Sequence, residues 1–178
     1  MALENLRTLI QGITGKVGGL GGGARQEAPG YASELSYGNM ALAADVVCPV
    51  NVWTKVAEYT VPAQELVAVG SGVQGDPHSQ GLVDIYLVTV APAQIVGKFR
   101  LLAQNARETK KEVIFEKSSS ILHGTGNTDK QGMLLIPESA VKVGEDSKLT
   151  LEVMPDAEQT VDFDGATNII KLPVTIYD

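Results

Sequence analysis

Short hydrophobic segments, separated by proline, glycine and charged residues, run from about residue 51 to the end of the chain. They are rich in valine, isoleucine and leucine, and they end too often at proline or glycine to be helices. Short segments of this kind are typical of β-strands. The predicted strands cover residues 52–59, 66–69, 82–90, 95–102, 112–116, 133–136, 149–153 and 168–177.

Several details refine these predicted strands. Leu82 to Val90 is apolar except for Asp84, which suits a strand buried on both faces. Gly97 predicts a bulge or bend, and Pro173 predicts that the last strand lies at a sheet edge. Asp164-Gly165 is a hairpin-turn signal. Eight or nine short strands indicate an all-β sandwich or barrel, and eight over residues 51–178 fit an antiparallel jelly-roll sandwich.

The first fifty residues have a different pattern and predict an extended N-terminal arm. Apolar residues recur at intervals of three and four, which predicts an amphipathic helix over residues 2–13. Residues 15–23 contain six glycines and predict a flexible tether, and residues 24–50 predict irregular structure. The predicted contact residues of the arm are Leu3, Leu6, Leu9, Ile10 and Ile13.

A helix of about twelve residues is marginal alone in water, so the arm needs a surface to lie on. That surface is either protein, in its own domain or a neighbouring subunit, or a membrane interface. The polar face of the predicted helix has few Lys or Arg residues, which weighs against a membrane.

The charge of the chain excludes some partners. Fourteen Lys and Arg stand against 21 Asp and Glu, a formal net charge of −7, so direct nucleic-acid binding is not expected. No apolar run reaches the length of a membrane span, and Glu4, Arg7 and Gln11 interrupt any secretory signal. We therefore expect synthesis in the cytoplasm without a signal peptide. Cys48 is the single cysteine, so no internal disulfide forms, and we expect it to be a small buried residue.

No sequence motif in the chain predicts a catalytic or cofactor-binding site. Gly70 to Gly75 matches a dinucleotide-binding glycine pattern but lacks the following helix, so it predicts a turn. Ser118 to Ser120 with His123 lacks an oxyanion-hole signature and predicts a polar linker. We expect no catalytic residue, no cofactor and no enzyme activity.

Two binding chemistries are weighed and set aside. His78, His123 and Cys48 do not form a metal-ligand cluster, so no metal site is expected, although Asp162 and Asp164 with Glu145 or Asp146 leave a weak calcium site open. Trp53 and Tyr59 lie six residues apart, on one face of an extended strand, and predict core packing rather than a carbohydrate platform.

Several stretches together resemble a known family. They are Trp53, Glu58 to Gln64, Gly70-x-Gly72, Gln80-Gly81, Gly97 to Leu102 and Glu145 to Leu149. Over residues 51–178 the chain resembles the single jelly-roll capsid proteins of tailless icosahedral viruses with an internal membrane, which infect archaea and thermophilic bacteria.

The resemblance implies a non-enzymatic subunit of a virion capsid that assembles with copies of itself and other capsid proteins. It also implies that the arm contacts neighbouring subunits or internal membrane lipid. Two alternatives stay open: a surface filament or fibre subunit that assembles by strand complementation, and a ligand- or carbohydrate-binding β-sandwich module.

Overall fold

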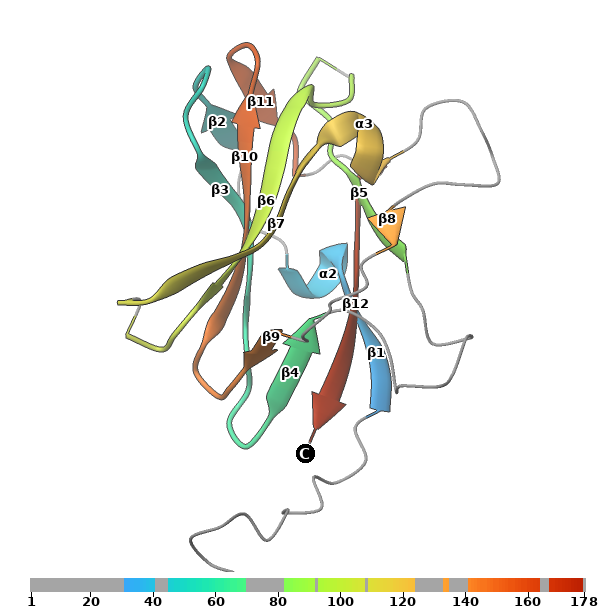
Figure 1. Cartoon of the computed structure of the whole chain (residues 1–178). Helices are drawn as coiled ribbons and strands as arrows, with labels where there is room; N and C mark the ends of the chain where they lie inside the picture. The colour runs from blue at the N-terminus through green and yellow to red at the C-terminus, as the bar shows by residue number, and fades with distance from the viewer. Residues whose placement is uncertain are drawn as a thin grey trace, which may run out of the picture.

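The computed structural model describes residues 31–40, 45–69, 82–91, 93–107, 109–123, 133–134, 141–163 and 167–177. Their chain path consists of short β-strands and two helical turns (Figure 1). The elements are β1 (Tyr31–Ser36), α2 (Tyr37–Met40), β2 (Val46–Cys48), β3 (Thr54–Thr60), β4 (Leu66–Val69), β5 (Leu82–Tyr86), β6 (Gly97–Gln104), β7 (Lys111–Ser118), α3 (Ser119–Leu122), β8 (Met133–Leu134), β9 (Val141–Val143), β10 (Lys148–Pro155), β11 (Gln159–Val161) and β12 (Ile169–Tyr177).

One layer of the molecule is an antiparallel sheet in the order β3-β10-β6-β7. Successive side chains of a strand point to opposite faces, and β10 follows this rule. Its residues Leu149, Leu151 and Val153 are fully buried and belong to the hydrophobic core. Thr150 and Glu152 therefore lie on the outer face.

The second layer is centred on β12, the last strand of the chain. Lys171 pairs with Ser36 of β1 and also with Asp84 of β5, so β1 and β5 lie on opposite sides of β12. β4 pairs with β12 at residues 174–177 and β5 at residues 169–171, so both occupy the same side in succession. β9 pairs with β4, and β8 with β5. The sheet therefore has four strand positions, two of them shared by a pair of short strands.

The path of the chain between the two sheets is that of a jelly roll. It runs from β1 to β3, back to β4 and β5, across to the β6–β7 hairpin, back to β8 and β9, across to β10 and finally to β12. Eight strand positions in two antiparallel sheets, joined mostly by crossings from one sheet to the other, define this fold. The predicted fold class, an all-β jelly-roll sandwich, is confirmed.

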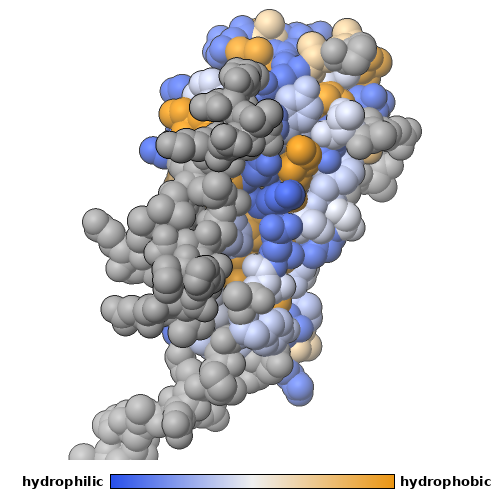
Figure 2. All heavy atoms as spheres, turned by 90° about the vertical axis from the view of Figure 1, so that its right-hand side faces the viewer, coloured by the Kyte–Doolittle hydropathy of each residue, from blue (hydrophilic) through white to orange (hydrophobic). Residues whose placement is uncertain are grey.

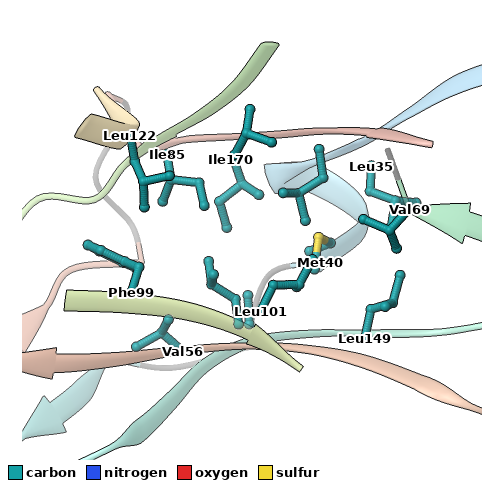
Figure 3. Close-up of a cluster of buried hydrophobic side chains, with 14 of the residues drawn as sticks. Leu35, Met40, Val56, Val69, Ile85, Phe99, Leu101, Leu122, Leu149 and Ile170 are labelled. Atoms are coloured by element: carbon teal, nitrogen blue, oxygen red, sulfur yellow. The ribbon is translucent and has the colours of Figure 1, made fainter. Parts of the chain in front are cut away.

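The core lies between the two sheets. Figure 3 shows Leu35, Val69, Ile85 and Ile170 on one side, facing Val56, Phe99, Leu101 and Leu149 on the other. Met40 of α2 is also fully buried in this layer. Because α2 contacts β1, β12 and β3, it closes one open side of the sandwich.

A small third sheet closes one end of the sandwich, at the top of Figure 1. It consists of β2 and β11. Thr89 forms an isolated β-bridge with Val161, on the side of β11 that faces away from β2. The inner residue Val161 is fully buried. Tyr37 stacks on Phe163 with 6.2 Å between ring centroids and donates a hydrogen bond to its carbonyl oxygen, which fixes the end of this sheet to α2.

The sandwich begins earlier in the chain than the sequence indicated. Residues 31–48, expected to be irregular, contain β1, α2 and β2, and Leu35 of β1 pairs with Leu172 in the core. These strands carry no clear alternation of polar and apolar residues, and their pairing partners lie over a hundred residues away in sequence. Residues 1–30, with the predicted helix over 2–13 and the tether over 15–23, lie outside the described residues.

Three further predictions differ from the structure. Pro173 does not mark an edge strand, because β12 is paired on both sides; the residue lies where the pairings of β4 and β5 meet. The strand predicted over residues 82–90 ends at Tyr86, and Val90 is 58% exposed. Ser119 begins the helical turn α3 rather than a linker, because the Ser118 side chain accepts a hydrogen bond from the Ser120 N–H as its N-cap. The Asp164-Gly165 turn lies outside the described residues.

Cys48 is fully buried, as predicted. Burial raises the pKa of its thiol to about 11, against a smaller opposing effect of a hydrogen bond with Thr54. The thiol is therefore neutral at physiological pH and is a poor nucleophile.

Replacing Gly97 by alanine should destabilise the fold, because a Cβ there would lie 2.4 Å from the carbonyl oxygen of Met154 on the neighbouring strand. The expected loss is about 1–3 kcal/mol of unfolding free energy, measured by urea denaturation. Gly38→Ala is the matched control, since its nearest neighbour would be the Ser36 Oγ at 3.9 Å. Equal stabilities of the two variants would contradict this packing.

Alkylation by iodoacetamide should distinguish native from unfolded Cys48. At pH 8 the native thiol should react slowly, and its rate should rise as the pH approaches about 11. In the unfolded chain the thiol has its ordinary pKa of about 8.5 and should react quickly. The same shift should lower the stability of the fold as the pH rises from about 8.5 towards 11, because the unfolded state then loses its proton first. A Val47→Cys/Cys48→Ala variant, with its cysteine at a half-exposed neighbouring position, should label quickly when folded. Rapid labelling of native Cys48 at pH 8 would be inconsistent with its burial.

Candidate interaction surfaces

The outer face of the sheet β3-β10-β6-β7 carries a cation held between an aromatic ring and a carboxylate. Arg100 of β6 lies over the Trp53 ring at 4.2 Å from its centroid, and its Nε and Nη2 both lie 2.6 Å from the Glu152 Oε2. The Arg100 and Glu152 side chains are 25% and 13% exposed, so this pair is partly shielded from water. It joins the two central strands across the outside of the sheet.

Trp53 and Tyr59 do not share a face, contrary to the sequence prediction. The register of β3 on β10 shifts between Leu151 and Glu152, which is a β-bulge. Tyr59 packs against the core, while Trp53 covers Arg100 on the outside. Burial, with smaller contributions from Glu65 and Tyr31, raises the pKa of Tyr59. The prediction of core packing holds for Tyr59 alone, and with one ring outside there is no two-ring carbohydrate platform at these positions.

Other charges on this sheet also form ion pairs. Glu58 contacts both Lys55 and Lys148, and Lys98 contacts Glu116. Such exposed pairs contribute little to stability. Their charges instead discourage further strand pairing, since both edge strands, β3 and β7, carry them. The other edge strand β1 has one charged residue, Glu34, and is less protected.

A buried aspartate and histidine connect α3 to β5. The His123 Nδ1 lies 2.8 Å from the Asp84 Oδ1, and both side chains are nearly buried. The Tyr86 ring contacts the imidazole, with 4.5 Å between centroids. This contact explains the single charge that the sequence showed in the predicted buried strand.

The aspartate and histidine do not extend to a serine nucleophile. The Ser119 Oγ accepts a hydrogen bond from the Gly97 N–H, and the Ser118 and Ser120 hydroxyls contact each other at 3.0 Å. Within the described residues, none of these hydroxyl groups is a hydrogen-bond partner of His123. The arrangement fixes α3 in place and provides no hydrolytic triad.

The carboxylates of the weak calcium hypothesis lie far apart. Glu145 and Asp146 form the turn before β10, where the Glu145 Oε2 accepts a hydrogen bond from the Gln64 N–H. Asp162 follows β11 at the other end of the sandwich, with its N–H bonded to the Val88 carbonyl oxygen. Across the described part of the chain, no group of three potential ligands could hold a metal ion.

Exposed valines gather at the end of the sandwich that the small third sheet closes. We call this surface the valine end and define it by Val47, Val50, Val52, Val90 and Val96, each of which is about half exposed. In Figure 2, orange hydrophobic residues lie among blue hydrophilic ones over this upper end. The sequence suggested burial for valines in predicted strands and could not show this cluster.

A groove lies at the other end of the sandwich, between the β6–β7 hairpin and β9. We call it the lysine groove; its volume is about 660 Å³. Its apolar wall comprises Ala103, Val141 and Val143, and its rim carries Lys110, Lys111 and Lys142. The Lys142 Nζ lies over the Tyr177 ring at 5.1 Å from its centroid. In the sequence this site is marked by the adjacent Lys110-Lys111 pair, which the spacing of apolar residues does not reveal.

The predicted arm contact residues, Leu3, Leu6, Leu9, Ile10 and Ile13, lie outside the described residues. The chain enters the sandwich at Tyr31, which pairs with Ile176 at the same end as the lysine groove (Figure 1). Neither helical turn in the described part of the chain has the length and apolar character needed to cross a membrane.

Comparison with known proteins identifies the fold but no family. No family model matches the chain, and no curated protein matches it in sequence. Among solved structures, it is similar to the VP16-VP17 complex, a complex of the two major capsid proteins of bacteriophage P23-77, with a TM-score of 0.57 and 11% identity over 84% of this chain and 99% of that one.

A second similar structure is VP17, a capsid protein of the same bacteriophage. It aligns with a TM-score of 0.57 and 12% identity, over 85% of this chain and 97% of that one. At this identity the likeness concerns the fold. The chain thus has the fold of phage capsid proteins along almost their whole length, and the predicted resemblance is confirmed at that level.

Proposed function

We propose that this chain is a structural subunit of a virion capsid, without enzymatic activity. The observation that carries this proposal is the fold match to P23-77 capsid proteins, which covers 97% and 99% of those chains and leaves no large part of them unmatched. A jelly roll alone is compatible with many functions. Coverage of complete capsid chains is more specific.

The surfaces of the sandwich agree with a role in assembly. Two pairs of polar side chains that could support chemistry, the nearly buried Asp84 with His123 and the partly buried Arg100 with Glu152, are engaged in structural contacts. Exposed apolar residues instead concentrate at one end. Half-exposed valines in a cluster are typical of surfaces that bind other proteins.

In this proposal the subunit associates with copies of itself and with other capsid proteins, and the acidic body forms shell rather than binding the genome directly. The N-terminal arm contacts a neighbouring subunit or internal membrane lipid through Leu3, Leu6, Leu9, Ile10 and Ile13. A tether that links two weak contacts raises the effective concentration of the second.

The filament alternative draws support from one feature. β1 is a lightly charged edge strand, directly preceded by residues 1–30, and such an edge can accept a strand from another chain. Electron microscopy of the purified full chain separates these functions. Rings, capsomers or closed shells are expected, whereas filaments would favour the alternative and a protein that stays monomeric at all concentrations would contradict both.

Deleting residues 1–30 should reduce the yield of assembled particles at least about tenfold while leaving the thermal unfolding of the sandwich unchanged. The reason is that the deletion removes the predicted contact residues but ends just before β1, so every strand of the sandwich is kept. Particle yield is measured by sedimentation and folding by circular dichroism.

A point variant refines this test. Leu6→Asp/Ile10→Asp alters the apolar stripe and should reproduce the loss, whereas Thr8→Asp/Gln11→Asp adds the same charge off the stripe and should not. Equal particle yields from both pairs would refute the role of the apolar stripe.

A further inference from the structure

The valine end contains a row of outward-facing side chains across three chain segments. Thr160 of β11 pairs with Val47 of β2, and its carbonyl oxygen accepts a hydrogen bond from the Val90 N–H at 3.1 Å. The next residue, Val161, points into the core and is fully buried, so Thr160 and its two neighbours point outwards. Val47 and Val90 are 57% and 58% exposed.

Two further contacts extend this apolar row. Val96 is held beside β11 by two hydrogen bonds with the Gln159 side chain, at 3.3 Å and 3.2 Å. The segment that carries Val50 and Val52 is attached through the Asn51 N–H, which bonds to the Pro155 carbonyl oxygen at 3.0 Å. These backbone and side-chain hydrogen bonds hold the five valines of the valine end on one frame.

The segments that form the valine end carry acidic charge alone. Residues 45–52, 88–96 and 156–163 contain no Lys or Arg and four acidic residues: Asp45, Asp156, Glu158 and Asp162. Asp156 and Glu158 are exposed on the rim. A partner for this surface therefore needs apolar side chains surrounded by positive charge.

This chemistry disfavours two occupants. The same end of a second copy would bring four acidic residues against four others. A membrane interface prefers Lys, Arg, Trp and Tyr, and residues 45–52, 88–96 and 156–163 contain none of these.

The lysine groove has the required chemistry. Its exposed Lys110, Lys111 and Lys142 accompany an apolar lining of the partly buried Ala103 and Val141 and the buried Val143, and the one acidic lining residue is Glu112. It lies at the opposite end of β6 and β10 from the valine end (Figure 1). One copy of the chain therefore cannot bring its own two surfaces together.

We propose that the valine end of one subunit docks into the lysine groove of a second copy. The valines pack on the apolar wall of the groove, while Asp156 and Glu158 face Lys110 and Lys111. Because two different surfaces meet, the contact is heterologous; a rotation between successive subunits closes it into a ring, which is the form that a capsomer requires. This inference deepens the proposed capsid function, since it names a contact through which subunits assemble.

Charge exchange between the two surfaces provides the test. The first full-length variant is Asp156→Lys/Glu158→Lys, which has two basic ends, and the second is Lys110→Glu/Lys111→Glu, which has two acidic ends. Each alone should self-associate at least about tenfold more weakly than the unmodified chain. Their equimolar mixture should recover association, because each altered end now complements the altered end of the other variant. Sedimentation velocity measures all of these samples, at low and at high salt.

Matched controls carry the same charge changes elsewhere on the sandwich. Glu34→Lys/Glu116→Lys and Lys117→Glu/Lys171→Glu alter exposed positions outside both surfaces and should associate like the unmodified chain. Val47→Asp/Val90→Asp should weaken association as strongly as the charge variants, while Val113→Asp, at a half-exposed valine of β7, should not. Circular dichroism confirms that each variant is folded.

Three outcomes would overturn the inference. They are undiminished association of either charge variant alone, failure of the mixture to recover association, and loss of binding to anionic or zwitterionic vesicles when Val47 and Val90 are changed, which would show a lipid surface instead. If the unmodified chain forms capsid-like particles that all these variants also form, the inference fails but the capsid function stands. If the unmodified chain never assembles, the proposed function fails with it.

Discussion

The fold depends on the pairing of β12, the last strand, on both of its sides. β1 comes from the start of the sandwich and β4 and β5 from its middle, and all three align on this one strand. Its alternate residues Ile170, Leu172, Val174 and Ile176 then face the core side chains of β10 and β6. Burial of these apolar faces is the main stabilising term of such a sandwich. The chain cannot complete its core until its C-terminal strand is in place.

The outer surfaces follow from the same constraint. When alternate side chains of a strand point into the core, the intervening ones point outwards. They either form contacts on the outer face of the sandwich or remain available to partners. On the sheet β3-β10-β6-β7 several of them form contacts with one another, through Arg100 with Trp53 and Glu152 and through exposed ion pairs. At the valine end and in the lysine groove, apolar surface is left open and bordered by charge of one predominant sign. The two kinds of surface suggest different roles, the first in keeping copies from pairing along strand edges and the second in bringing them together.

The sequence predicted the strands that carry a strong local hydrophobic pattern and missed β1, β2, β9 and β11, for a physical reason. β4 was predicted with its observed bounds, and β10 and β12 within a few residues, because apolar runs between strong breakers are local signals. β1, β2, β9 and β11 owe their structure to distant partners, which no local pattern reveals. The bulge beside Leu151 separated Trp53 from Tyr59 by changing a period that the sequence implied was constant. The valine end was missed because a valine in a predicted strand is expected to be buried. Whether these valines are exposed depends on how the third sheet closes the end of the sandwich, which no local pattern shows.

The arrangement of β4 and β5 on β12 has a consequence for how such a chain can change over time. Both short strands pair with β12, β4 at residues 174–177 and β5 at residues 169–171. The next strands outward are divided in the same way, since β9 pairs with β4 and β8 with β5. The alignment on each side of the break is therefore set by the pairing with β12 itself. Either short strand can therefore change in sequence while the other keeps its register on β12, because each makes its own set of pairings.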